Sequence, residues 1–248
     1  MSLTDYGRQA PLYDRGRALP AKGLGPWAAA VQPFLADAKT LVDVGAGTGI
    51  FAHAFAEAFP ALTVLAVEPS VPMLERARVE RSHPRVRYLE GTAEALPLDE
   101  PVDIAWLSTV IHHVDRRRAA ASLAQRVRPG GHVLLRGVWP GHTAGITLFR
   151  YFPEAAAVIE SAYPTFEEVR AIFHDAGLEF AARLDVQQET AGSLQEYFDK
   201  VETRADTTMA RIEDRAFHEG LERLRHAVDT ATPTPVVDTL ELTVFVVH

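Results

Sequence analysis

The stretch LVDVGAGTGIF, residues 41–51, places Gly45, Gly47 and Gly49 at every second position directly after an apolar run. The apolar run has the character of a buried strand, and the residues from Ile50 onward have the spacing of an amphipathic helix. The glycines therefore lie on a strand-to-helix turn, where backbone N–H groups can meet a nucleotide-like ligand. Three positions without side chains predict that something approaches the backbone closely there.

Strands and helices alternate along the chain on either side of this turn. Apolar runs predict strands at 40–46, 62–70, 86–92, 102–110, 132–138, 179–189 and 239–247, and helical spacing predicts helices at 50–59, 71–81, 115–127 and 165–177. Such alternation, with apolar strands, is typical of a parallel sheet that is covered on both faces. We expect an α/β fold: a doubly wound, Rossmann-like, mostly parallel sheet of seven strands with helical lid insertions.

Composition and charge limit the classes of function. The 248 residues include no cysteine, which excludes disulfides, thiolate zinc sites and thiol nucleophiles. A formal net charge of −8 with dispersed basic residues argues against a nucleic-acid partner. No apolar segment is long enough to cross a bilayer, and the amino terminus lacks the apolar core of a signal peptide. We therefore expect a cytoplasmic protein with no membrane partner.

The spacing of the glycines distinguishes between classes of nucleotide ligand. A dinucleotide fingerprint, G-x-G-x-x-G, requires glycine at position 50, where this chain has Ile50, so binding of NAD or NADP is not expected. Residues Asp43 to Gly49 instead read acidic-x-G-x-G-x-G. This pattern resembles the first motif of the class I methyltransferases that use S-adenosylmethionine (SAM).

Three further stretches strengthen the resemblance, which covers residues 38–137. LAVEPS ends a strand at Glu68, EGTAEALPLDEPVDIAWL resembles the adenine-binding turn of the family, and RVRPGGHVLLR resembles its closing helix, glycine turn and fifth strand. The resemblance implies that SAM binds and that S-adenosylhomocysteine (SAH) leaves as the product. The residues expected to contact the cofactor are Asp43, Gly45, Ala46, Gly47, Gly49, Glu68, Pro69, Met73, Thr92, Ala93, Glu94, Leu107 and Tyr13.

Several of these residues carry specific expectations from the family. Glu68 would accept hydrogen bonds from both ribose hydroxyls. Thr92 stands where the family commonly has an aspartate, so the adenine amine would meet a hydroxyl or Glu94, while Ala93 offers its backbone N–H. Met73 either packs on the adenine or fills the core. Tyr13, with Tyr6 and Arg17, lies in a segment that folds over the cofactor in similar proteins.

The resemblance also implies how the chain is divided. We expect one domain, residues 1–248, in which 1–37 form an amino-terminal lid segment and 38–138 form the SAM-binding core. Residues 139–165 and 191–235 form acceptor-side lid insertions. The first insertion carries aromatic residues that could line an apolar acceptor pocket: Trp139, Phe149, Tyr151, Phe152 and Tyr163.

Two adjacent histidines, His112 and His113, end the fourth predicted strand, at the sheet edge where the transferable methyl group is expected. Histidine is the usual base near neutral pH, and small-molecule members of the family often carry such a pair. The pair either deprotonates the acceptor or anchors the loop. An acid that assists the base in some similar enzymes is replaced here by Gly137. No metal site is expected, because neighbouring side chains diverge and no further ligands complete a tetrahedron.

These observations predict an enzyme that transfers a methyl group from SAM to an oxygen, nitrogen or carbon atom of a small, partly apolar metabolite. The resemblance is to methyltransferases of bacterial secondary metabolism. Two alternatives stay open: an enzyme of the same fold that keeps SAM but catalyses a cyclisation or elimination, and a non-catalytic SAM-binding protein. We expect a monomer or a homodimer.

Overall fold

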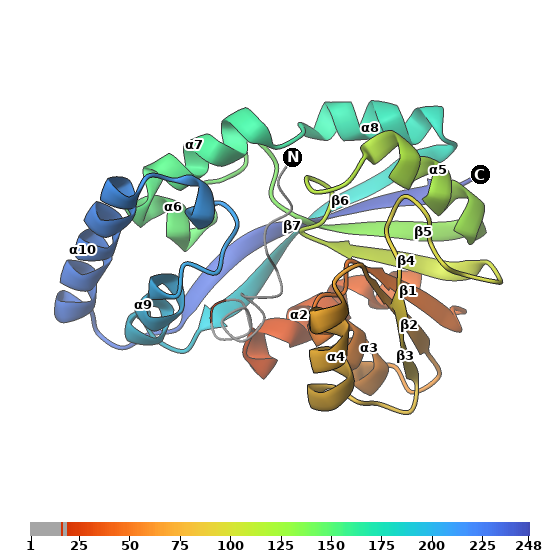
Figure 1. Cartoon of the computed structure of the whole chain (residues 1–248), viewed down its shortest axis with the longest axis horizontal. Coiled ribbons are helices and arrows are strands. Elements are labelled where there is room, and N and C mark those ends of the chain that lie inside the picture. The colour runs from red at the N-terminus through yellow and green to blue at the C-terminus, as the bar shows by residue number, and fades with distance from the viewer. Residues whose placement is uncertain (1–15, 17–18) are drawn as a thin grey trace.

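The computed structural model of the chain describes residue 16 and residues 19–248. Seven strands form one sheet in the order β3-β2-β1-β4-β5-β7-β6 (Figure 1). The strands are β1 (Thr40–Val44), β2 (Thr63–Glu68), β3 (Val86–Glu90), β4 (Val102–Ser108), β5 (Val127–Gly137), β6 (Leu178–Ala191) and β7 (Val236–Val247). Strands β1 to β5 are parallel, and β7 runs antiparallel to both β5 and β6. The expected mostly parallel, seven-stranded α/β fold is confirmed.

The strand order reverses between β1 and β4, because the chain moves outward through β2 and β3 on one side and through β5 on the other. Ligands of open α/β sheets bind outside the carboxyl ends of the strands at such a switch point. The glycine turn follows β1, and the two adjacent histidines follow β4. The topology therefore brings both predicted motifs to one edge of the sheet.

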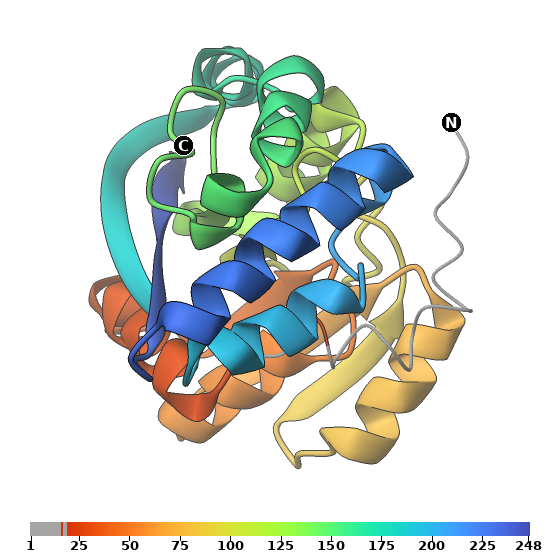
Figure 2. The ribbon, with the colours of Figure 1, turned by 90° about the vertical axis from the view of Figure 1, so that its left-hand side faces the viewer.

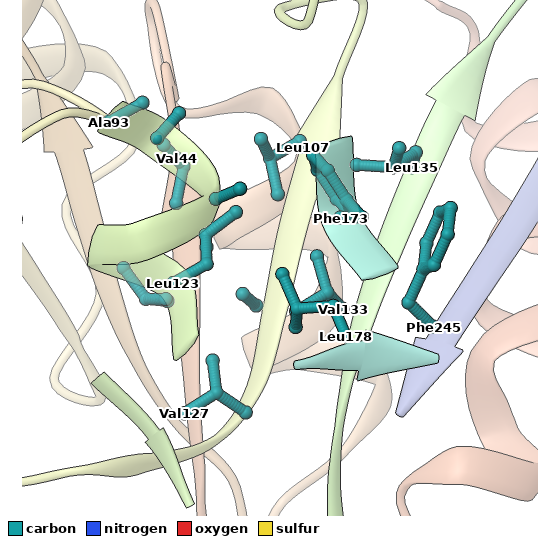
Figure 3. Packing of buried hydrophobic residues seen from close by; sticks show 14 of the residues in the cluster. Val44, Ala93, Leu107, Leu123, Val127, Val133, Leu135, Phe173, Leu178 and Phe245 are labelled. Atoms are coloured by element: carbon teal, nitrogen blue, oxygen red, sulfur yellow. The ribbon is translucent and has the colours of Figure 1, made fainter. Parts of the chain in front are cut away.

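Helices cover both faces of the sheet. On one face lie α2 (Ala21–Val31) and α3 (Ile50–Ala58), where Phe55 meets Trp106 of β4 edge to face, with ring centroids 5.0 Å apart. Helix α4 (Val71–Glu80) packs beside α3 against β2 and β3. On the other face lie α5 (Arg116–Arg126) and α8 (Phe166–Asp175). Figure 3 shows this second core, in which Leu123 of α5 and Phe173 of α8 lie over the strands and Phe173 packs against Phe245 of β7.

Side-chain caps explain where two of the predicted helices, α5 and α8, begin. Asp115 accepts hydrogen bonds from the backbone N–H groups of Arg117 and Arg118 at the start of α5. Thr165 and Glu168 form a reciprocal capping box at the start of α8. Helices α3 and α4 begin without a side-chain cap. The predicted limits of all four helices differ from the structure by only one or two residues.

The two insertions are helical and share a core of their own. They contain α6 (Thr147–Tyr151), α7 (Pro153–Ala162), α9 (Leu194–Glu202) and α10 (Asp214–Thr230), which gather at one end of the sheet (Figure 1). Two short 3-10 helices, η1 (Gln32–Phe34) and η2 (Met209–Arg211), complete the described elements. Figure 2 shows α9 and α10 side by side. Phe152 lies directly on the backbone of α10 at Gly220, where an added Cβ would come within 2.2 Å of the Phe152 ring.

Candidate functional site

The turn after β1 requires glycine for two physical reasons. Gly45, Gly47 and Gly49 have φ values of 69°, 56° and 82°, in the left-handed region that side chains disfavour. A Cβ at Gly45 would lie 2.6 Å from Val110, and one at Gly49 would lie 2.7 Å from the Tyr88 hydroxyl. The close approaches at Gly45 and Gly49 therefore come from the protein's own side chains, and the sequence pattern did not distinguish these from a ligand.

Asp43 lies in β1, just before this turn, and borders a cavity. Its side chain is 2% exposed, and its Oδ2 has no hydrogen-bond partner among the described residues. Burial raises the pKa of Asp43 to about 7; a hydrogen bond from the Ala52 backbone opposes this, and the negative charge of Glu68 adds to it. A carboxyl oxygen at the cavity wall therefore lacks a donor.

Glu68, the last residue of β2, holds the turn from the other side. Its two carboxylate oxygens accept hydrogen bonds from the backbone N–H groups of Gly47, at 2.9 Å, and Ser70, at 3.0 Å. Burial raises the pKa of Glu68, and these two hydrogen bonds lower it. Each oxygen keeps a second lone pair, so the side chain can hold the turn and still accept from a ligand.

The predicted adenine turn has a visible structural role. Glu94 Oε1 accepts a hydrogen bond from the backbone N–H of Asp115, at 2.9 Å, and so ties the turn to the start of α5. Ala93 and Met73 are buried in the protein core, whereas Thr92 and Pro69 are exposed.

A cavity of about 260 Å³ opens where the carboxyl ends of the parallel strands meet the insertions. The predicted site residues that border it are Asp43, Gly45, Ala46, Leu107 and His112. Those that do not border it are Gly47, Gly49, Glu68, Pro69, Met73, Thr92, Ala93, Glu94 and His113. Tyr13, Tyr6 and Arg17 lie outside the described residues.

The insertions supply the apolar wall of the same cavity. Among the predicted aromatic residues, Trp139, Phe149 and Tyr163 border it, whereas Phe152 is fully buried in the core that the insertions share. Ile159 of α7 and Met209 of η2 also line the cavity. One end of the cavity is therefore the glycine turn, and the other is an apolar space under the helices.

The two histidine side chains do not diverge as the sequence predicts, because their ring centroids lie 3.9 Å apart. His112 borders the cavity and stacks on Tyr163, with ring centroids 3.8 Å apart and an interplanar angle of 17°. His113 is exposed. Between β4 and the pair, Thr109 has a φ of 55°, a conformation that is uncommon for a residue with a branched side chain. Of the two rings, only that of His112 is placed to meet a molecule in the cavity.

The cavity wall also contains a buried hydrogen-bond network that the sequence did not reveal. The Arg136 guanidinium, at the end of β5, donates to Ser108 Oγ at 3.0 Å and to Gln188 Oε1 at 2.6 Å. It also lies 4.8 Å from the ring centroid of Trp27 and 5.1 Å from that of Phe51. The one signal for this network in the sequence was Arg136, a basic residue within an apolar strand. Its partner Gln188 lies in β6, far along the chain.

Comparison with known proteins identifies the family. The methyltransferase domain family matches residues 42–135. An uncharacterized methyltransferase of Mycobacterium ulcerans is 34% identical over 185 residues, which are 63% of this chain and 72% of that protein. The chain belongs to the class I SAM-dependent methyltransferases. The family predicted from the sequence is confirmed.

Other members of this family match over a shorter length. The uncharacterized methyltransferase Rv3342 of Mycobacterium tuberculosis is 37% identical over 141 residues, which are 56% of this chain and 53% of that protein. The chain thus spans about half the length of such relatives. A putative methyltransferase from an antibiotic biosynthesis pathway of Anabaena variabilis has the same fold, with a TM-score of 0.70 and 21% identity over 90% of this chain and 96% of that one.

The described residues contain neither a candidate membrane span nor a candidate metal site. Within residue 16 and residues 19–248, no helix combines the length and the apolar character that a membrane span needs. In the same part of the chain, no three histidine, aspartate or glutamate side chains come together in a way that could hold a metal ion.

Proposed function

We propose that this chain transfers a methyl group from SAM to an oxygen, nitrogen or carbon atom of a small, partly apolar molecule. The observation that supports this most directly is the single cavity that joins the glycine turn of β1 to the aromatic side chains of the first insertion. Cofactor and acceptor would then share one enclosed space. The Anabaena structure, described as a methyltransferase of antibiotic biosynthesis, is consistent with a small-molecule acceptor.

The residues at the β1 end fit a cofactor that carries hydrogen-bond donors. Asp43 Oδ2 is buried at the cavity wall and lacks a donor within the described chain. Gly45, Ala46 and Leu107 would hold SAM together with Asp43, and Glu68 would fix the turn behind them. When bound, SAM supplies a methyl group that its own sulfonium charge activates.

The protein's part in the reaction is to position the acceptor and to exclude water. Tyr163 and Phe149 would hold an apolar acceptor, and positioning of this kind contributes roughly 7–11 kcal/mol to lowering a barrier. His112 would take the proton that the acceptor loses, which adds about 10²–10⁴-fold. The stacking of His112 on Tyr163 fixes the plane of the ring that performs this step.

The test is incubation with SAM that carries a deuterated methyl group and with a fractionated metabolite extract. The proposal predicts a product heavier by one labelled methyl group and an equal amount of SAH. The structure of SpnF, a 4+2 cyclase, shares the fold, with a TM-score of 0.64 and 18% identity over 97% of this chain and 93% of that one. A new product without SAH would favour that class of reaction, and binding without any product would favour a non-catalytic protein.

A further inference from the structure

The buried network at the cavity wall has a fixed direction. Trp27 Nε1 and the Arg136 guanidinium can only donate, so Gln188 Oε1 accepts from both, at 2.9 and 2.6 Å. The amide nitrogen of Gln188 then donates to Thr190 Oγ1 at 3.3 Å. The Thr190 hydroxyl, which has accepted one hydrogen bond, donates its proton to Asp238 Oδ2 at 2.7 Å. The network therefore ends on an accepting oxygen of Asp238.

The second oxygen of Asp238 also accepts. Oδ1 receives the backbone N–H of Thr147, at the start of α6, at 2.7 Å. Both oxygens of Asp238 thus have a hydrogen-bond donor, and accepting on both oxygens is the pattern of a carboxylate. Asp238 is 5% exposed and borders the cavity, and no lysine, arginine or histidine of the described residues forms an ion pair with it. Asp238 thus borders the cavity without an ion-pair partner in the part of the chain that the structure describes.

Two side chains of α9, Tyr197 and Lys200, border the cavity together with Asp238. Tyr197, on α9, is buried beside it, and burial together with the charges of Asp238 and Asp206 raises the pKa of the Tyr197 phenol well above its usual range. Lys200, one turn further along α9, is directed to the backbone oxygen of Thr190, at 2.6 Å, and to Glu196. These contacts of Lys200 are with Thr190 and Glu196 and not with the Asp238 carboxyl group.

We propose that Asp238 binds a protonated amine of the acceptor and that the acceptor is an apolar or aromatic molecule with such a group. This inference rests on the proposed function, because it names the class of molecule that occupies the acceptor end of the cavity. A buried carboxylate prefers a cation to a neutral donor, since the cation also compensates its charge. Tyr163 and Phe149 line the same cavity, and aromatic rings attract cations as well as apolar surfaces.

The test compares three probes that share a phenylethyl group and differ in charge: 2-phenylethylamine, which is protonated at neutral pH, 2-phenylethanol and 3-phenylpropionate. Calorimetry with saturating SAH should give the ammonium probe the highest affinity, about 10- to 100-fold above the alcohol. Equal affinities for the three probes, or a preference for the carboxylate, would overturn the proposal. Because the comparison uses the unaltered protein, it does not depend on the folding of a variant.

Two matched variants locate the effect. Asp238→Asn should lose the 10- to 100-fold preference for the ammonium probe, because the amide keeps the size of the side chain and loses its charge. Asp199→Asn removes one negative charge from the exposed side of α9 and should keep the preference. An unchanged preference in Asp238→Asn contradicts the proposal. Titration with SAH alone, and of the probes without SAH, separates a failure at Asp238 from a failure of the cofactor site.

Discussion

The cofactor end and the acceptor end of the cavity are built in different ways. At the cofactor end, the glycine turn is held by Glu68, 21 residues from its partner Gly47, and the glycines themselves are required by their backbone angles. At the acceptor end, Gln188 and its partner Trp27 are 161 residues apart, and Asp238 is 91 residues from Thr147. A backbone constraint restricts which residue a position accepts, whereas a contact between distant side chains leaves no local pattern.

The largest expected effect concerns His112, at the border between the two ends. If His112 takes the proton of the acceptor, His112→Ala should lower turnover about 10²–10⁴-fold and leave SAM affinity nearly unchanged. The loss falls on the transition state and not on cofactor binding. The measurement is the single-turnover rate with saturating SAM, with the acceptor found in the labelled-methyl experiment.

His113→Ala is the matched control, since this histidine is exposed and does not border the cavity. It should retain most of the wild-type rate. Equal losses of turnover in both variants, together with weaker SAM binding, would show that the pair holds the loop. His112 would then not be the base.

The second effect tests whether the cofactor end is incomplete without a ligand. Asp43 has a pKa of about 7 in the folded chain, above its ordinary value of 3.8. As pH rises through this interval, the unfolded chain loses the proton first, so the free energy of unfolding falls, by up to about 4 kcal/mol. Asp43→Asn does not titrate and should lack this fall. Denaturant unfolding of ligand-free protein at about pH 4 and about pH 8 measures the difference, and parallel profiles for the two proteins would contradict it.

The third effect concerns the other carboxylate of the cofactor end. Glu68→Gln should weaken SAH binding by about 1.5–3 kcal/mol, because a charged acceptor becomes neutral. The remaining carbonyl oxygen can still accept from Gly47, so the turn is retained. Glu90→Gln, at the paired position of β3 and exposed, is the control and should bind SAH as the wild type does. Calorimetry that shows equal affinity for Glu68→Gln and Glu90→Gln would remove Glu68 from the cofactor site.

The smallest effect concerns two helical glycines, Gly25 and Gly220, whose surroundings differ. Gly25, in α2, has open space beyond its chain neighbours, but it precedes Pro26, whose ring crowds a Cβ on the residue before it in a helix, so Gly25→Ala should leave the free energy of unfolding within about 1 kcal/mol of the wild type. At Gly220, in α10, the new methyl group would overlap the Phe152 ring, and Gly220→Ala should destabilise by about 1–3 kcal/mol. Thermal unfolding measures both. A melting temperature of Gly220→Ala equal to that of the wild type would show that α10 adjusts freely over Phe152.

The sequence predicted what local chemistry dictates. The strands, the capped helices α5 and α8 and the glycine turn were all found, because apolar periodicity, Asp115, Thr165 and the positive φ values act over a few residues. Helix α2 was missed for a physical reason: AKGLGPWAAAV contains two glycines and Pro26, which disfavour a helix. Its stability comes from burying Trp27 and Val31 against the sheet.

The acceptor end was predicted only in outline. Aromatic residues in the first insertion indicated an apolar wall, and three of them border the cavity. Helix α6 has five residues, too few for periodicity to reveal it. The network from Arg136 to Asp238 joins β5, β6 and β7, and its partners become neighbours only when β7 enters the sheet between the other two.

That position of β7 has a consequence for synthesis on the ribosome. Strand β7 follows both of its neighbours in the chain, yet it supplies the hydrogen-bonding edge that β5 and β6 need. Until it emerges, the nascent chain carries the four helices of the two insertions and a fourteen-residue strand, β6, whose partner in the final sheet is still missing. Translation adds roughly 5–20 residues per second, so these unpaired edges persist for seconds and are open to aggregation. Chaperones that shield exposed strands would act in this interval, before Asp238 arrives to close the network at the acceptor end.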